Sequence, residues 1–255
     1  MIRRLKRALG IHFSSKALAR NPDIALRQYL GRFRSFPDLA AGLLDAAPAT
    51  IVQVGANDGS ANDPLGRMIA ARPDRIAQAL LFEPQTSAFA RLSARYAGRD
   101  NIRCLNAAVG REAGLQTVWT IDRTAASELL RRPISDGIAS FDRSHVETVL
   151  RDNAPNAAAE DLLGLIRSED VRVTTLKDAA AEAGIGEPDI LLVDTEGFDA
   201  EIMRMALEAG WRPKLVQYEH KHLQPADRRE LSARLRSEGY RLWADHADVW
   251  GQRSS

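Results

Sequence analysis

The run Asp189–Val193 is the sequence feature that most restricts how this 255-residue chain folds. It contains four consecutive apolar residues and is bounded by Pro188 and Asp194. A short strand without alternation of polar and apolar side chains is typical of a parallel sheet that is covered by helices on both faces. The run therefore predicts an α/β fold built around such a sheet.

Other short apolar runs alternate with helical patterns along most of the chain. The helices are about a dozen residues long, and the last two runs lie close enough in sequence to form an antiparallel pair. This alternation predicts a mostly parallel sheet. The predicted strands are 51–54, 79–82, 102–105, 189–193, 215–218, 240–243 and 249–251, and the predicted helices include 85–96, 176–183, 200–209 and 225–237, with another starting at Asp63-Pro64.

The region between the third and fourth of these strands is too long for a simple connection. Within it we expect a strand at 117–121, helices at 144–150 and 157–166, and a strand at 171–175. We therefore predict that residues 111–170 form an inserted lid or substrate region within a domain spanning 48–255.

Basic residues are concentrated at the N-terminus. Residues 1–36 contain nine Lys or Arg and one acid, which leaves 26 basic and 33 acidic residues in the rest of the chain. Ile2, Leu5 and Leu9 recur at helical spacing, so residues 1–47 are expected to form a basic helical extension with breaks near Pro22 and Pro37. Two interpretations stay open: a solvated capping helix, or a helix that contacts an anionic membrane surface or a protein partner.

The composition limits both the cellular compartment in which the protein is expected and the class of protein to which it belongs. The chain is 45% hydrophobic and 27% charged, which excludes global disorder, and no apolar run approaches the roughly 18 residues needed to cross a bilayer. A single cysteine, Cys104, cannot form an internal disulfide and points to a reducing compartment. We expect a cytoplasmic protein, peripheral at the inner membrane face if the basic extension binds there. Because the basic residues lie away from the site motifs, nucleic acid is not an expected partner.

Polar residues at the ends of the first two strands predict a nucleoside site. The glycines Gly55 and Gly59 allow a sharp turn and close approach of a ligand to the backbone. Glu83, followed by Pro84, ends the second strand, where a carboxylate can accept hydrogen bonds from both hydroxyls of a ribose. The spacing of the glycines does not match the G-x-G-x-x-G pattern of dinucleotide-binding folds.

The ends of the fourth and fifth strands carry candidate catalytic groups. Asp194 and Glu196 follow the buried strand, and two nearby carboxylates at such a position are costly unless they serve a ligand, a proton or a cation. His220 and His222 follow the next strand, and histidine suits proton transfer near neutral pH.

The insertion carries candidate substrate-binding residues. Two interpretations stay open: Phe141 stacks on a sugar face and Arg143 binds an anionic acceptor, in a loop that we expect to close over the site, or Phe141 is a core residue and Arg143 is solvated. We also expect His145, in the same segment, and His222 to contact the substrate.

The order of these motifs resembles the FkbM family of S-adenosylmethionine-dependent methyltransferases. The similarity extends from about residue 50 to 243, and its segments are IVQVGANDGS, LLFEPQTSAFARL, NIRCLNAAVG, DGIASFDRSH, VTTLKD, DILLVDTEGFDAEIM and LVQYEHKHL. The resemblance implies a Rossmann-like class I methyltransferase fold with a seven-stranded sheet. It also implies methyl transfer to an oxygen, usually a hydroxyl of a saccharide or secondary metabolite. One departure is Gln53, which stands where many class I methyltransferases carry an acid.

The resemblance also implies roles for individual residues. Glu83, with Pro84, would hold the ribose of the cofactor, and Asn106 and Ala107 would border its adenine. Contact with the methionine part would come from Gly55, Ala56, Asn57 and Gly59, and Asp58 of the same turn would also contact the cofactor.

Asp194 and Glu196 would then face the transferred methyl group. We rank His220 first as the base, with the two acids as orienting groups. In an alternative, these acids bind Mg²⁺, which acidifies the acceptor hydroxyl. The competing hypotheses are an NAD(P)-dependent oxidoreductase and a non-catalytic protein that binds an adenosine ligand and docks through its basic arm.

Overall fold

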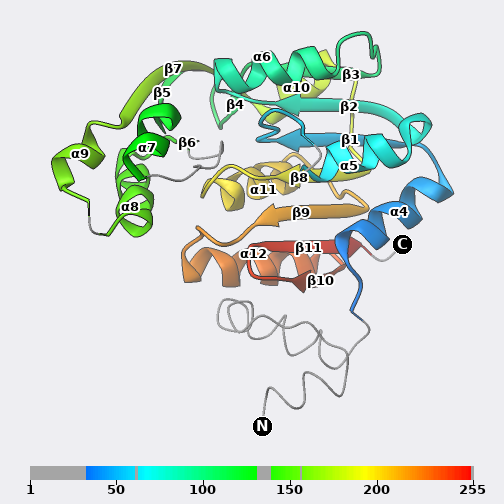
Figure 1. Cartoon of the computed structure of the whole chain (residues 1–255). Helices are drawn as coiled ribbons and strands as arrows, with labels where there is room; N and C mark the ends of the chain where they lie inside the picture. The colour runs from blue at the N-terminus through cyan, green and yellow to red at the C-terminus, as the bar shows by residue number, and fades with distance from the viewer. Residues whose placement is uncertain (1–32, 61–62, 131–138, 156, 254–255) are drawn as a thin grey trace.

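The computed structural model describes residues 33–60, 63–130, 139–155 and 157–253 (Figure 1). The predicted helix at the extreme N-terminus and the break near Pro22 lie outside the described residues, so the proposed role of the basic extension stays a prediction. Among the helices that the structure describes, none combines the length and the apolar character needed to cross a membrane.

A seven-stranded sheet forms the centre of the molecule. Its strand order is β10-β11-β9-β8-β1-β2-β3, and β11 alone is antiparallel to its neighbours. This confirms the mostly parallel sheet with a final antiparallel pair. The strands are β1 (Ala49–Val54), β2 (Ile76–Phe82), β3 (Ile102–Leu105), β8 (Ile190–Val193), β9 (Leu215–Glu219), β10 (Tyr240–Ala244) and β11 (Asp248–Arg253).

Helices cover both faces of this sheet. Val52 and Val54 of β1 belong to one apolar cluster, with residues of α10, α11 and α12, whereas Ile51 belongs to a second cluster, with residues of α4, α5 and α6. All four residues of β8 are buried, as the unbroken apolar run predicts. The helices are α4 (Phe36–Ala46), α5 (Pro64–Ala71), α6 (Thr86–Arg95), α10 (Leu176–Glu182), α11 (Asp199–Glu208) and α12 (Pro225–Ser237), with a 3₁₀ turn, η1, at Pro73–Arg75.

Proline and cap residues set where two of these helices begin. Asp63 caps α5 by accepting a hydrogen bond from the backbone N–H of Gly66 at 2.8 Å, which confirms the predicted start. Pro37 does not break a helix as expected. It lies in the first turn of α4, where the missing N–H costs nothing.

The described part of the segment between β3 and α10 forms a second sheet with its own helices. It lies beyond the carboxyl ends of the parallel strands (Figure 1), and its strand order is β4-β7-β5-β6. Its elements are β4 (Ala108–Val109), β5 (Gly114–Ile121), α7 (Arg123–Leu130), β6 (Ala139–Ser140), α8 (Arg143–Asn153), α9 (Ala159–Leu163) and β7 (Ile166–Thr174).

The predicted helix over 157–166 and the predicted strand over 171–175 are partly wrong. The helix is only α9, and β7 already begins at Ile166. The physical reason is pairing: β7 runs antiparallel to β5 from Ile166 opposite Ile121 to Val173 opposite Gly114. Its first half is polar and largely exposed, so the sequence carries no hydrophobic alternation there to indicate a strand.

Candidate active site

A cavity of about 510 Å³ lies where the carboxyl ends of the main-sheet strands meet the insertion. Its wall includes Gly55 after β1, Glu83 after β2 and Asp194 after β8. On the other side, the insertion contributes Phe141 and His145. Strand ends of an open parallel sheet are where such folds bind ligands, so this cavity is the candidate active site.

Gly55 joins the ends of three strands. Its φ of +82° lies in the left-handed region, and a Cβ built on it would stand 1.7 Å from the backbone oxygen of Asp194. The backbone N–H groups of Gly55 and Ala56 both donate to the carbonyl of Phe82, at 3.0 and 2.9 Å. Only glycine fits this position, because any side chain would push β1 and β8 apart.

The rest of the turn, residues 56–59, does not line the cavity. Gly59 (φ +63°) packs on α6, since a Cβ there would lie 2.8 Å from Leu92 and 2.9 Å from Tyr96. Asp58 accepts a hydrogen bond from the N–H of Ser60 at 2.9 Å. Of the five residues of this turn predicted to contact the cofactor, only Gly55 lines the cavity. The contacts of the other four stay a prediction.

Glu83 is a buried carboxylate at the cavity wall. It is 3% exposed, and its two oxygens accept hydrogen bonds from the N–H groups of Gln85 at 2.9 Å and Asn57 at 2.8 Å. Burial raises the pKa of Glu83 to about 7, against the lowering effect of these two bonds. Because each oxygen keeps a further lone pair, the carboxylate can still accept from two hydroxyls.

An apolar wall continues from Glu83 along the cavity. Pro84 and Ala107 line it, together with Phe82 and Val109. Asn106 does not line it: its side-chain amide donates to the carbonyls of Glu83 at 3.0 Å and Pro84 at 2.9 Å. Asn106 therefore fixes the loop that carries the carboxylate.

Asp199 holds the loop between β8 and α11 and was not among the predicted site residues. It is fully buried and accepts hydrogen bonds from the hydroxyl of Thr195 at 2.9 Å, the N–H of Gly197 at 3.2 Å and the N–H of Glu219 at 3.1 Å. Burial raises its pKa. The available signal was its place in the first turn of a helix, where a carboxylate is favoured.

Asp194 lines two cavities. Besides the candidate site, it borders a second cavity of about 640 Å³ that Asp63, Asp245 and Asp248 also line. The Asp194 side chain is exposed to solvent through these cavities. Its pKa is raised well above the usual value, first by desolvation and then by the charges of Asp199 and Glu196. Burial likewise raises the pKa of Asp248 to about 7.

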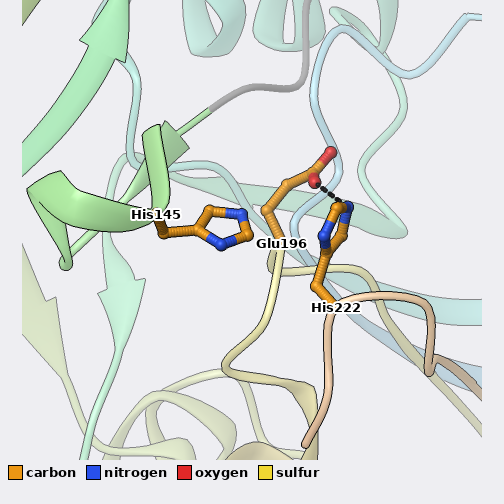
Figure 2. A group of neighbouring side chains, drawn as sticks. All are labelled: His145, Glu196 and His222. Carbon is orange, nitrogen blue, oxygen red and sulfur yellow. Dashed lines mark ion pairs between the residues drawn. The ribbon is translucent and has the colours of Figure 1, made fainter. Parts of the chain in front are cut away.

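Three side chains converge on the other side of the cavity: His145 of α8, Glu196 of the β8–α11 loop, and His222 after β9 (Figure 2). His222 Nε2 and Glu196 Oε2 are 3.2 Å apart. The His145 and His222 rings meet edge to face, with centroids 4.9 Å apart. Burial, and then the neighbouring His222, lower the pKa of His145, which favours the neutral imidazole.

His220 lies elsewhere. It is completely buried and is absent from the walls of both cavities. Its backbone N–H donates to the carbonyl of Ala247 at 2.8 Å, and its Nε2 is 3.3 Å from the carbonyl oxygen of Asp245. The His220 side chain therefore lies against the turn between β10 and β11 and not in the candidate site. His222, two residues later, is the histidine of this segment that reaches the cavity.

Phe141 and Arg143, two of the three residues of the insertion expected to bind substrate, also differ in placement. Phe141 lines the cavity and meets Phe198 edge to face, with ring centroids 6.1 Å apart. Arg143 is absent from the wall: it pairs with Glu147 at 3.1 Å and lies over the Trp119 ring, 5.2 Å from its centroid. Its predicted role in binding an anionic acceptor stays a prediction.

Comparison with known proteins identifies the domain type. Residues 53–242 match the methyltransferase FkbM domain. Among curated proteins, none matches the chain. Similar solved structures include an FkbM methyltransferase from Methylobacillus flagellatus, with 13% identity and a TM-score of 0.48 over 80% of this chain. This chain spans 43% of the length of that protein.

Two further structures with lower TM-scores are similar. Fibrillarin from Aeropyrum pernix, solved with natively bound S-adenosyl-L-methionine, has 11% identity and a TM-score of 0.36, covering 84% of this chain and 73% of its own. The ribosomal protein L11 methylase from Lactobacillus delbrueckii subsp. bulgaricus has 9% identity and a TM-score of 0.36, covering 85% and 78%.

Proposed function

The chain belongs to the FkbM methyltransferase family, and we propose that its S-adenosylmethionine-dependent reaction methylates a hydroxyl of a saccharide or of a glycosylated secondary metabolite. One observation carries the proposal. The same cavity has a buried carboxylate beside an apolar wall on one side, and a cluster of histidine and carboxylate groups on the other. The family membership favours this function over the oxidoreductase and the non-catalytic hypotheses.

The first side fits the adenosine part of the cofactor. Glu83 is already held by two backbone N–H groups, so its orientation costs little conformational entropy when it accepts hydrogen bonds from ribose hydroxyls. Phe82 and Ala107 offer apolar surface for the adenine base. The residues present therefore fit the nucleoside.

The reaction needs alignment and a proton acceptor. Bound S-adenosylmethionine would supply a methyl group on a sulfonium. The cavity walls hold the acceptor oxygen in line with that methyl, and much of the rate enhancement arises from this alignment. We assign proton removal to Asp194 rather than to His220, because Asp194 lines the cavity and His220 does not.

The other side of the cavity suits a polyhydroxylated acceptor. Asp142, Glu196 and Asp227 line it and supply oxygens that accept hydrogen bonds from hydroxyls. The Phe141–Phe198 pair supplies an aromatic surface on which a sugar face can stack. Carboxylates and aromatic rings together are suited to neutral saccharides better than to anionic ones.

The test is a methyl-transfer assay with the full chain. It uses S-adenosylmethionine labelled in the methyl group and a panel of saccharides and glycosides, with amine and carboxylic acid acceptors alongside. At subsaturating S-adenosylmethionine we expect label in a base-stable methyl ether, strongly reduced in Glu83→Gln and retained in Glu182→Gln, which changes an exposed glutamate of α10. Methyl amines or base-labile esters as the only products would contradict O-methylation of a hydroxyl.

A further inference from the structure

His145, Glu196 and His222 come from three separate parts of the fold, yet they meet at one point of the cavity. One ligand atom from each residue, an imidazole nitrogen or a carboxylate oxygen, lies within 4.8 Å of the other two (Figure 2). Within the described part of the chain, this is the one group of at least three His, Cys, Asp or Glu residues with such spacing. His145 belongs to the insertion, whereas the other two follow strands of the main sheet.

The two histidines present nitrogens that have no hydrogen-bond partner within the described structure. His145 Nε2 and His222 Nε2 are both buried and make no hydrogen bond, and the same holds for Oε2 of the neighbouring Glu219, which lies 3.7 Å from His222 Nε2. His222 Nε2 approaches Glu196 Oε2 to 3.2 Å, but the contact lacks hydrogen-bond geometry. Buried polar atoms without partners are rare and call for a ligand. Close approach without a hydrogen bond is the arrangement that two ligands of one ion adopt.

We propose that His145, Glu196 and His222 bind one divalent first-row transition metal ion, with Zn²⁺ preferred, and leave a coordination position open to the cavity. Two histidines and a carboxylate with an open position form a known type of catalytic zinc site. Tetrahedral zinc ligands lie about 3.3 Å apart. The His222–Glu196 spacing already meets this value, and the remaining pairs close by about 1.5 Å or less through side-chain rotation.

This site differs from the Mg²⁺ site expected from the sequence. That expectation paired Glu196 with Asp194, but Asp194 is not a member of the group. Hard cations such as Mg²⁺ prefer oxygen ligands and retain several waters, whereas imidazole ligands favour zinc and its neighbours in the first row. The donor set therefore selects against Mg²⁺.

The role of the ion rests on the proposed function. Its open position would take the acceptor hydroxyl and lower the pKa of that group, as a Lewis acid does. The hydroxyl proton passes to the carboxylate of Asp194. The oxygen then forms its bond to the methyl carbon while the carbon–sulfur bond breaks and its electron pair stays on sulfur. Because His145 belongs to α8 of the insertion, whereas Glu196 and His222 follow strands of the main sheet, the ion would also link the insertion to the main sheet.

Metal binding itself is the test. The full chain is stripped with a chelator and titrated with Zn²⁺ by calorimetry and with Co²⁺ by visible absorption. We expect one ion per chain and the intense absorption bands of four-coordinate Co²⁺. His145→Gln and His222→Gln should each weaken binding at least 100-fold. The matched control, His246→Gln, changes an exposed histidine outside both cavities and should bind like the wild type.

Two further readouts separate this proposal from the proposed function. Thermal unfolding should show stabilisation by Zn²⁺ in the wild type and in His246→Gln but not in His145→Gln. Titration with S-adenosylhomocysteine should give the same affinity in all four proteins, which also shows that the variants fold. Absence of zinc binding, or binding that both cluster variants retain, would overturn the metal site. Zinc binding without any affinity for S-adenosylhomocysteine would leave the metal site standing and overturn the proposed function.

Discussion

The two sides of the cavity are built in different ways. On the cofactor side, Gly55 and Glu83 are fixed by backbone contacts: the glycine against Asp194 and the carboxylate by two N–H groups. On the acceptor side, His145 and His222 have buried nitrogens that make no hydrogen bond, and Glu219 has a buried oxygen that makes none.

The difference shows which side depends on a ligand. A group whose hydrogen bonds are already made needs no rearrangement to bind, and such preorganisation reduces the entropic cost of binding. A group left unpartnered carries a desolvation cost that a ligand relieves. The cofactor side is therefore complete in the free chain, whereas the acceptor side is completed by what binds there.

The largest effect should come from filling the turn after β1. Gly55→Ala would place a methyl group 1.7 Å from the Asp194 backbone oxygen at a φ of +82°, so we expect a loss of about 3 kcal/mol or more in unfolding free energy. Gly98→Ala is the matched control: its φ is +78° and its Cβ would meet nothing within 4 Å. It should cost about 1–2 kcal/mol. Urea denaturation measures both, and equal losses would show that Gly55 does not lock the strands together.

Removing the charge of the buried carboxylate should act on the cofactor alone. In Glu83→Gln, the side-chain NH₂ faces one of the two backbone N–H groups and one ribose hydroxyl loses its acceptor. We expect about 100-fold weaker binding of S-adenosylhomocysteine, which corresponds to about 2.7 kcal/mol. Calorimetry measures the affinity, with Glu182→Gln as the control. An affinity within threefold of the wild type would remove Glu83 from the ribose site.

The raised pKa of Glu83 should make cofactor binding depend on pH. With a pKa of about 7, the carboxyl is mostly neutral at pH 6 and mostly ionised at pH 8. The ionised form accepts from both ribose hydroxyls, so the affinity for S-adenosylhomocysteine should rise about tenfold from pH 6 to pH 8. Calorimetry across this range tests it. In Glu83→Gln this rise should be absent. A wild-type affinity that falls from pH 6 to pH 8 would contradict the prediction.

Shortening the aromatic side chain of the insertion should affect the acceptor side only. Phe141→Ala removes one ring of the Phe141–Phe198 pair, and we expect a 3- to 10-fold increase in acceptor KM, corresponding to about 0.7–1.4 kcal/mol. The affinity for S-adenosylhomocysteine should stay within twofold. Leu115→Ala, at an exposed leucine of β5, is the control. Equal weakening of cofactor and acceptor would show that the two sides are not independent.

The main sheet could be predicted from the sequence because the hydrophobic pattern within each segment is enough to identify its strands and helices. The unbroken apolar run of β8 and the alternation of strands with helices give the architecture, and Asp63-Pro64 gives the start of α5. The insertion is harder, since β7 becomes a strand through pairing with β5 rather than through its own hydrophobic pattern. Pairing between distant segments leaves no local signal.

The site shows the same limit. Glu83, Asp194 and Glu196 follow strands, and the rule that ligands bind at strand ends finds them. The choice between His220 and His222 depends on how the chain turns after β9, where the His220 N–H donates a hydrogen bond to the carbonyl of Ala247. Likewise, no spacing in the sequence brings His145 of α8 next to His222. Only the packing of the insertion on the main sheet does so.

The most direct test of this division is a calorimetric titration of the chelator-stripped full chain with S-adenosylhomocysteine, repeated with saturating Zn²⁺ and with NAD⁺ in place of the first ligand. A cofactor side that is complete in the free chain predicts one site per chain, micromolar affinity that Zn²⁺ leaves unchanged, and no binding of NAD⁺. Binding that appears only after metal is added would contradict the independence of the two sides. Binding of NAD⁺ alone would contradict the assignment of the cofactor.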